Sequence, residues 1–465
     1  MNASYLLYSL SSFGLYTLAL ILLAGQAFTW RETRTLFYVG RRKFSLVSSV
    51  ATFCATWMSG ASLVGCTMYL YLSGYEAFTG SVHGWLLGLV CLPFIVLRLR
   101  KRPVLSLPEW LAFEYGDARL RTLSALSLVL AYTFYIVIQF LVFAKVVGYM
   151  LDITYPLASV LVYLFVLYTT FGGMPSVVRS DMLNMAVILV GVSVGGWLIY
   201  TEAGGLGAIH AEVFRRDPSM LAITSREGLL FTLAMMLGWG FGVAANPQYA
   251  IRIISARSTR TAWRMLGFTG LIVGWIYVCI TVIGLGGRAL LTMNIPFGQE
   301  AGFAQLFSTV LSPLPAMLLL LAVLAASVST ANSELLLAAC SWCYDVRGES
   351  RKPEQDPLME DRFIFHNRIA ITVISTAALI ISFFNLPGIL ILGRYSWSVV
   401  AICFLLPLYS PLRPSGKGLF AAIGSALILH TLLVVFGGQL PEIAMLYALL
   451  LEAVLWACAA RGENR

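Results

Sequence analysis

Long apolar segments follow one another along this chain and constrain its fold more than any other feature. A helix that crosses a membrane needs roughly 20 mainly apolar residues, because lipid offers no partners to an open backbone. About thirteen such segments lie at residues 5–28, 45–72, 78–97, 123–151, 155–171, 181–200, 229–250, 267–285, 315–342, 369–384, 389–409, 419–436 and 443–460. With 59% hydrophobic and only 11% charged residues, the composition excludes a soluble globular protein. We therefore expect an all-α polytopic membrane protein.

The basic residues are distributed unevenly between the connecting loops. Most of the 31 Lys and Arg residues fall in alternate loops such as RLRKR at 98–102, whereas the other loops hold Arg215, Arg216, Arg226 and Arg288. Cytoplasmic loops carry an excess of Lys and Arg, and an odd number of spans places the termini on opposite sides. We expect a multi-pass protein of the cell (inner) membrane, with its N-terminus outside and its C-terminus in the cytoplasm. The net charge of +9 then reflects topology, and no nucleic-acid partner is expected.

A stripe of small and hydroxyl-bearing residues lies inside one apolar segment, in LAASVSTANSE at 324–334. Ala326, Ser329, Thr330 and Ser333 are spaced i, i+3, i+4 and i+7, so they share one helix face. Hydroxyls find no partner in lipid, and this face should therefore point into the protein. Two interpretations remain open on spacing alone: a packing seam of small residues, or an oxygen-rich cation site.

Two segments carry small or helix-breaking residues near their middle. Residues 54–66 read CATWMSGASLVGC, and residues 237–242 read LGWGFG, followed by Asn246-Pro247. Paired interruptions of this kind are typical of transporters built from inverted repeats, in which discontinuous helices bind ions and substrate at the middle of the membrane. Close packing at glycine is the alternative explanation for either segment alone.

Five stretches together resemble the sodium/solute symporter family, nearest its pantothenate and proline transporter branch. They are ATWMSGAS at 55–62, SLPEWLAFEYGDARLR at 106–121, YTTFGGMPSVVRSDMLN at 168–184, GWGFGVAANPQYAIRIISARS at 238–258 and AASVSTANS at 325–333. The resemblance implies the fold of the bacterial leucine transporter, with two inverted repeats of five helices. Residues 1–44 would then be an extra helix and loop, 45–200 the first core repeat, 229–409 the second core repeat, and 410–465 two C-terminal helices.

The resemblance also implies a principal sodium site. Its ligands would be the backbone carbonyls of Ala55 and Met58, the carbonyl of Ala326, and the hydroxyls of Ser329 and Thr330. Sodium is thus the expected coupling ion. A hard cation prefers oxygen ligands, which agrees with the chemistry of these positions.

Some members of the family have a second sodium site, whose matching positions here are Asp181, Ser329, Asn332 and Ser333. Asn332 stands where those relatives have a serine. Glu334 stands where near relatives have glutamine. A carboxylate at this depth would draw the cation inward, couple protons or pair with a cytoplasmic arginine, and we favour the pairing.

Candidate substrate-binding residues are less sharply defined. Lys145 and Arg394 are cations within apolar segments and would attract an anionic substrate such as a carboxylate, unless they snorkel or form structural ion pairs. Trp57 and Trp239 lie at the two interrupted segments and would stack on a substrate, with packing as the alternative. His83 would face the substrate cavity, with packing inside the protein as the alternative. Trp57 replaces an aspartate of the proline transporters, which weakens a proline-type interpretation.

We therefore expect a sodium-coupled symporter that imports a small organic solute by alternating access, with an anion such as a pantothenate-like carboxylate favoured. The alternatives are a symporter of a neutral or zwitterionic solute such as an amino acid or sugar, a proton-coupled carrier that uses Glu334 and Asp181, and a membrane sensor with a transporter fold. The sequence has no nucleophile–base pair or metal-ligand cluster typical of an enzyme. The expected partners are the solute and the lipid bilayer, and the expected state is a monomer or a loose homo-oligomer.

Overall fold

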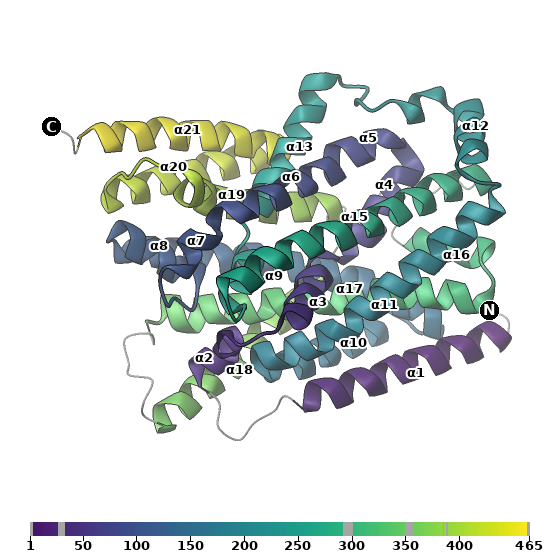
Figure 1. The fold of residues 1–465 in the computed structure, drawn as a ribbon, viewed down its shortest axis with the longest axis horizontal. Helices are drawn as coiled ribbons and strands as arrows, with labels where there is room; N and C mark the ends of the chain where they lie inside the picture. The colour runs from purple at the N-terminus through teal and green to yellow at the C-terminus, as the bar shows by residue number, and fades with distance from the viewer. Residues whose placement is uncertain are drawn as a thin grey trace.

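The structure is a computed structural model that describes residues 3–26, 33–291, 301–348, 357–384, 386 and 389–462. Most of its long helices lie side by side along one direction (Figure 1). Within the described ranges, the β-structure consists of one isolated bridge between Phe44 and Ala256. The prediction of an all-α membrane protein is confirmed.

The helices follow one another with short connections. The first half of the chain forms α1 (Ala3–Gly25), α2 (Arg34–Val39), α3 (Leu46–Trp57), α4 (Cys66–Ser73), α5 (Tyr75–Ala77), α6 (His83–Cys91), α7 (Val96–Arg100), α8 (Leu107–Tyr115), α9 (Ala118–Leu151), α10 (Tyr155–Phe171) and α11 (Gly173–Glu202). The second half forms α12 (Leu206–Arg216), α13 (Leu229–Ala244), α14 (Pro247–Ser255), α15 (Thr259–Leu290), α16 (Ala301–Val310), α17 (Pro313–Cys340), α18 (Pro357–Ile381), α19 (Ile389–Tyr409), α20 (Gly416–Val435) and α21 (Pro441–Gly462). Short 3₁₀ or π segments lie at Gly40–Arg42, Ala61–Gly65, Phe78–Val82, Leu92–Ile95, Pro218–Leu221 and Ser341–Val346.

Eleven helices in the described part of the chain are long and apolar enough to cross a membrane. A twelfth span is the bent pair Leu46–Trp57 and Ala61–Ser73, whose halves meet at an angle of 57°. The apolar helix α10 has 17 residues, which is the short limit for a span of about 30 Å. These twelve spans and α10 correspond to the thirteen predicted segments.

Helix α17 lies at the centre of the bundle. Every residue from Leu319 to Cys340 is buried, and α17 packs against α9 and α11 along much of its length. Gly191 of α11 permits this close approach, because a Cβ atom there would lie 2.4 Å from the carbonyl oxygen of Leu318. The stripe of small residues predicted from the sequence therefore faces protein on all sides.

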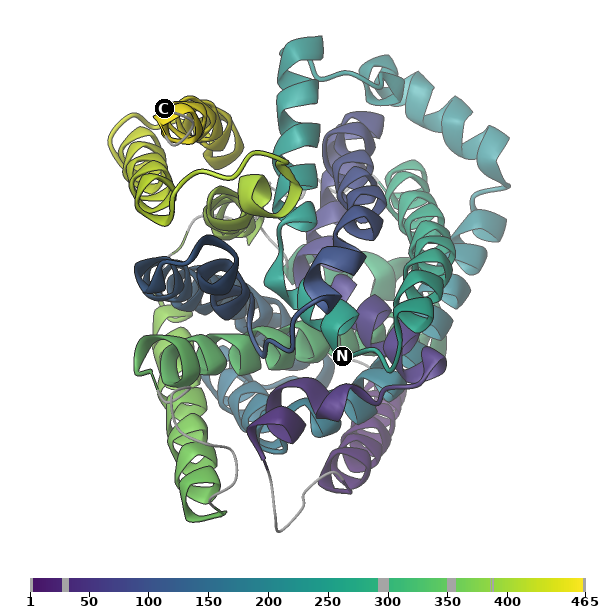
Figure 2. The same ribbon diagram turned by 60° about the vertical axis from the view of Figure 1, so that its left-hand side comes forward.

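The first and last helices lie on opposite sides of the bundle (Figures 1 and 2). Helix α1 packs against α11 and α17. The pair α20–α21 packs against α19 and α13, and forms one edge of the molecule in Figure 2. Helix α17 also contacts α3, α10, α14 and α18.

Candidate functional site

Two serines interrupt the helical hydrogen bonds at the end of α3. In an uninterrupted helix, the amides of Ser59 and Ser62 would close onto the carbonyls of Ala55 and Met58, four residues earlier. Instead, the Ser59 amide donates to Ser62 Oγ at 2.7 Å, and the Ser62 amide donates to Ser59 Oγ at 3.2 Å. The two backbone carbonyls that were predicted as ligands therefore lose their helical donors.

Helix α9 holds this break in place. The amide of Gly60 donates to Gln139 Oε1 at 2.9 Å, instead of to the carbonyl of Thr56 in its own helix. A Cβ atom at Gly60 would lie only 2.9 Å from the Cβ atom of Val142, so the backbone approaches α9 as closely as a glycine allows. The sequence did not reveal Gln139, which lies in the middle of an apolar segment.

The stripe on α17 faces the break. Thr330 Oγ1 lies 3.1 Å from the carbonyl oxygen of Met58 and 3.3 Å from that of Thr56. Ala326 lies one turn before Thr330 on α17, and both Ala326 and Ala55 are fully buried. The structure thus brings together the two helix segments that the sequence predicts to form the principal site.

A buried carboxylate lies next to this site. Asp181 of α11 is 0% exposed, and its Oδ1 accepts a hydrogen bond from Ser329 Oγ at 2.6 Å. Its Oδ2 accepts from Thr52 Oγ1 at 2.5 Å and lies 3.7 Å from a guanidinium nitrogen of Arg252. Ser329 therefore links the predicted ligands on α17 to a charged cluster that includes α11 and α14.

Arg252, which follows the apolar segment at 229–250, is a buried residue and not one of the loop arginines. It lies on α14 and is 2% exposed, and its Nη2 donates to Thr56 Oγ1 at 2.6 Å and to Ser333 Oγ at 2.5 Å. Its Nη1 donates to the carbonyl of Gln248 at 2.9 Å. The apolar neighbours Ile251 and Ile253 were the available signal that this arginine is buried.

Asn332 and Glu334, the remaining candidates on α17, form no hydrogen bond with Asp181 or Arg252 in the described part of the chain. Asn332 Oδ1 accepts hydrogen bonds from Thr169 and Thr170 of α10, at 2.7 and 3.2 Å. Glu334 is fully buried, and neither carboxylate oxygen has a hydrogen-bond partner among the described residues. The predicted pairing of Glu334 with an arginine is wrong for the described part of the chain, because the nearby Arg252 pairs with Asp181 instead.

The second interruption lies at the Asn246-Pro247 end of the predicted stretch and not at its glycines. Helix α13 continues through Gly238, Gly240 and Gly242 to Ala244, and the break falls at Ala245 and Asn246. Proline has no N–H to continue a helix, and Pro247 is instead the first residue of α14. Asn246 caps that helix, since its Oδ1 accepts from the Gln248 amide at 3.1 Å.

The glycines of α13 serve close packing. A Cβ atom at Gly238 would lie 2.4 Å from the Cβ atom of Glu442, and one at Gly242 would lie 2.8 Å from that of Trp397. The packing explanation left open by the sequence therefore accounts for these residues, and the helix break depends on the Asn-Pro pair.

Residues 37–410 match the Sodium:solute symporter family. The chain belongs to this family. Among solved structures, a Na+-coupled sialic acid symporter in a substrate-bound outward-open state has a similar fold, with a TM-score of 0.83 and 18% identity over 98% of both chains. A second similar structure is Mhp1, a nucleobase-cation-symport-1 family transporter in a closed conformation with bromovinylhydantoin bound. It has a TM-score of 0.61 and 14% identity, over 94% of this chain and 95% of that one.

The predicted family and fold are therefore confirmed. The protein is a multi-pass membrane transporter with the leucine-transporter fold, and it is not an enzyme. It is a sodium-coupled symporter, with sodium as the coupling ion and a small molecule as its substrate.

Two of the residues proposed to contact substrate lie in the symporter's aromatic core. Trp57 donates from Nε1 to Tyr277 Oη at 2.8 Å, and its ring lies 4.9 Å from that of Tyr249. Trp239 is 2% exposed, with its ring edge-on to Trp85. These two tryptophans thus belong to a continuous group of aromatic rings beside the two helix breaks.

The charged candidates are placed differently. Arg394 of α19 forms an ion pair of 3.1 Å with Glu442 of α21, in which the two side chains are 10% and 2% exposed. Of the alternatives that the sequence left open for Arg394, the structure shows the ion pair. Lys145 is half-buried on α9. His83 is exposed on α6, and its ring lies edge-on to that of Phe78.

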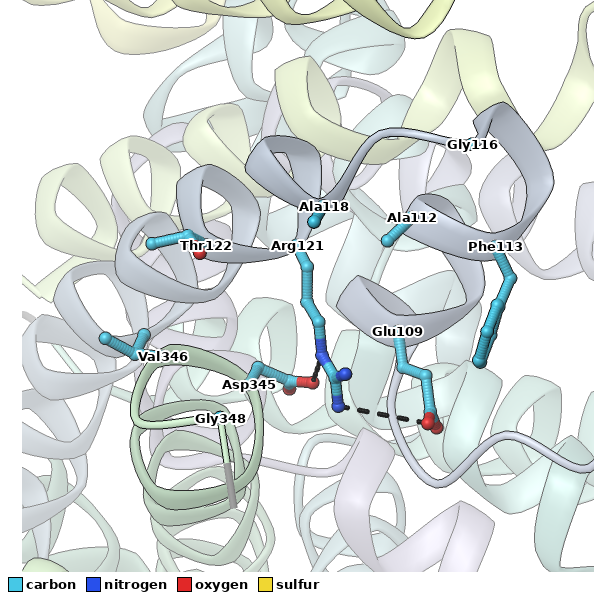
Figure 3. A pocket seen from close by; sticks show the side chains of 10 residues that line it. All are labelled: Glu109, Ala112, Phe113, Gly116, Ala118, Arg121, Thr122, Asp345, Val346 and Gly348. Atoms are coloured by element: carbon cyan, nitrogen blue, oxygen red, sulfur yellow. Dashed lines mark hydrogen bonds and ion pairs between the residues drawn. The ribbon is translucent and has the colours of Figure 1, made fainter. Parts of the chain in front are cut away.

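A second charged cluster lies where α8 and α9 meet the end of α17. A pocket of about 410 Å³ there contains Arg121, whose Nε donates to Asp345 Oδ1 at 2.6 Å and whose Nη2 lies 3.8 Å from Glu109 (Figure 3). Ser106 also donates to Asp345, at 2.8 Å. The motif at 106–121, noted for its resemblance to the family, thus anchors the end of the central helix.

Proposed function

We propose that the coupling sodium ion binds between the break of α3 and the middle of α17. Its ligands would be the carbonyl oxygens of Ala55, Met58 and Ala326, and the hydroxyls of Ser329 and Thr330. The observation that carries this proposal is the 3.1 Å approach of Thr330 Oγ1 to the Met58 carbonyl. The diversion of the Ser59 and Ser62 amides supports it, because it leaves carbonyl oxygens available to a cation.

A cation at this position would tie the first broken helix to the central helix. The bend of 57° between the halves of that broken span provides a point at which one half can move relative to the other. One elementary charge moving through 100 mV releases about 2.3 kcal/mol, and each tenfold sodium gradient adds about 1.4 kcal/mol. Alternating access would use this free energy to import the solute.

We propose that the solute binds beside the two breaks, among α3, α9, α13–α14 and α19. The rings of Trp57 and Trp239 support this position, since aromatic faces suit a small organic molecule. The preference for an anion was predicted from Arg394 and Lys145. Glu442 pairs with Arg394, which removes that part of the support, and we retain a carboxylate as the solute class to be tested first.

We also propose that the N-terminus is outside and the C-terminus is in the cytoplasm of a cell (inner) membrane. The support for this orientation is the excess of basic residues in alternate loops. A monomer or a loose homo-oligomer would suffice, since the candidate sodium ligands all come from one chain.

A thermal-shift screen of the purified protein tests the proposed function. The panel would contain carboxylates, amino acids, sugars and vitamins, each measured in sodium chloride and in choline chloride at equal ionic strength. We expect one class of solute to raise Tm in sodium and to lose that effect in choline. Equal shifts in both salts for every stabilising solute would contradict sodium-coupled binding.

A further inference from the structure

The cluster beside the candidate sodium site has the composition of a second cation site, yet a side chain of the protein fills it. We infer that the guanidinium of Arg252 is a resident cation, and that it limits this symporter to one sodium ion per transport cycle. This inference rests on the proposed sodium site and adds the stoichiometry.

The acidic partner of this resident cation is Asp181. Its side chain is 0% exposed, and the ionised form of a carboxylate this deeply buried is stabilised by a compensating positive charge. Arg252 supplies that charge at 3.7 Å, with its own side chain 1% exposed. In the described residues, Arg252 is the one cationic side chain that forms an ion pair with Asp181.

The neighbouring hydroxyls are engaged by the same guanidinium. Thr56 Oγ1 and Ser333 Oγ accept from Arg252 Nη2 at 2.6 and 2.5 Å, and they lie 3.0 Å from each other. Ser333 in turn donates to the carbonyl of Ser329 at 2.9 Å. A second sodium ion at the predicted site would need the Ser333 hydroxyl oxygen as a ligand, and this oxygen already accepts from Arg252.

The other oxygens of the predicted second site are also committed. Both carboxylate oxygens of Asp181 accept hydroxyl hydrogen bonds, from Ser329 and Thr52. The Asn332 side-chain oxygen accepts from Thr169 and Thr170 of α10. The oxygens of the predicted second site are therefore engaged by protein donors, and Arg252 balances the charge of Asp181.

Arginine differs from a bound ion in two respects that matter for transport. It stays protonated under all ordinary conditions, so its charge is constant. It is covalently attached to α14 and cannot be released to either side. The guanidinium would balance Asp181 in every cycle, and the principal site alone would carry sodium across the membrane.

Equilibrium binding of radioactive sodium alone to the purified full-length protein tests this inference. We expect one sodium ion per chain for the wild type and two for Arg252→Met, because the variant leaves Asp181 without a cation. The double variant Arg252→Met/Asp181→Asn should return to one. Arg252→Lys, which keeps the charge, and Arg257→Met, which removes an exposed charge from the same segment, should both bind one.

Two sodium ions bound to the wild type would overturn the inference and leave the proposed function standing. One sodium ion bound to a folded Arg252→Met protein would also overturn it. If that variant does not fold, the sodium dependence of the wild-type Tm decides: a Hill coefficient of one supports the inference, and a coefficient near two overturns it. No sodium bound to the wild type would instead mean that the proposed function fails.

Discussion

Thr330 Oγ1 lies 3.1 Å from the carbonyl oxygen of Met58, so the central helix and the first broken helix meet through oxygen atoms. Ser329, the preceding residue on α17, donates to Asp181 at 2.6 Å. Ser329 is thus both a proposed sodium ligand and a hydrogen-bond donor to Asp181, and it links the proposed sodium site to the cluster filled by Arg252.

Thr330→Val should weaken sodium binding while keeping the shape of the side chain. Loss of one oxygen ligand is worth about 1–3 kcal/mol, so the sodium concentration at half-maximal stabilisation should rise about tenfold or more. A sodium titration of Tm measures this. Thr372→Val on α18 is the matched control, since its hydroxyl bonds the Arg368 carbonyl within its own helix. Wild-type sodium dependence in Thr330→Val would remove Thr330 from the site.

Gly84→Ala should destabilise the protein through the contact of α6 with α13. A Cβ atom at Gly84 would lie 2.4 Å from the carbonyl oxygen of Met236, and a backbone atom cannot move aside as a side chain can. Overpacking of this kind costs about 1–3 kcal/mol. In the control Gly267→Ala, the added Cβ has nothing within 4 Å, and the variant should be as stable as the wild type. Chemical denaturation compares the two, and equal stability would disprove the contact.

The pair of Arg394 and Glu442 should behave as a structural unit. Removing one partner of a buried pair costs about 3–5 kcal/mol, because the other charge remains unpaired. Arg394→Met and Glu442→Met should each lower stability by such an amount, and the double variant should recover most of it. Solute-dependent stabilisation should survive in the double variant. Its loss there, despite recovered stability, would show instead that Arg394 contacts the solute.

The candidate sodium site was predictable because its signals are local in the sequence. The i, i+3, i+4 spacing of Ala326, Ser329 and Thr330 defines one helix face, and the small residues around Ser59 mark the broken partner. Both features depend on a few neighbouring residues, and the structure places them face to face. The resemblance to the family supplied the pairing of these two segments, which spacing alone could not provide.

Features that depend on tertiary contacts were missed or misplaced. In the sequence, Arg252 resembles an exposed arginine near a loop. Its burial depends on the ion pair with Asp181, which is distant in the chain. The glycines of α13 suggested a break, although their role is packing against α19 and α21. Glu334 was expected to pair with an arginine, whereas the nearby guanidinium is engaged by other groups. The pattern of a single sequence does not specify which of two buried carboxylates an arginine pairs with.

Solute uptake into proteoliposomes tests the central claim most directly. The solute identified by the thermal-shift screen would be offered with sodium outside, and then with choline replacing sodium at equal ionic strength and membrane potential. The sodium site predicts that uptake in choline falls to the background of protein-free liposomes. Equal uptake in the two salts would contradict it.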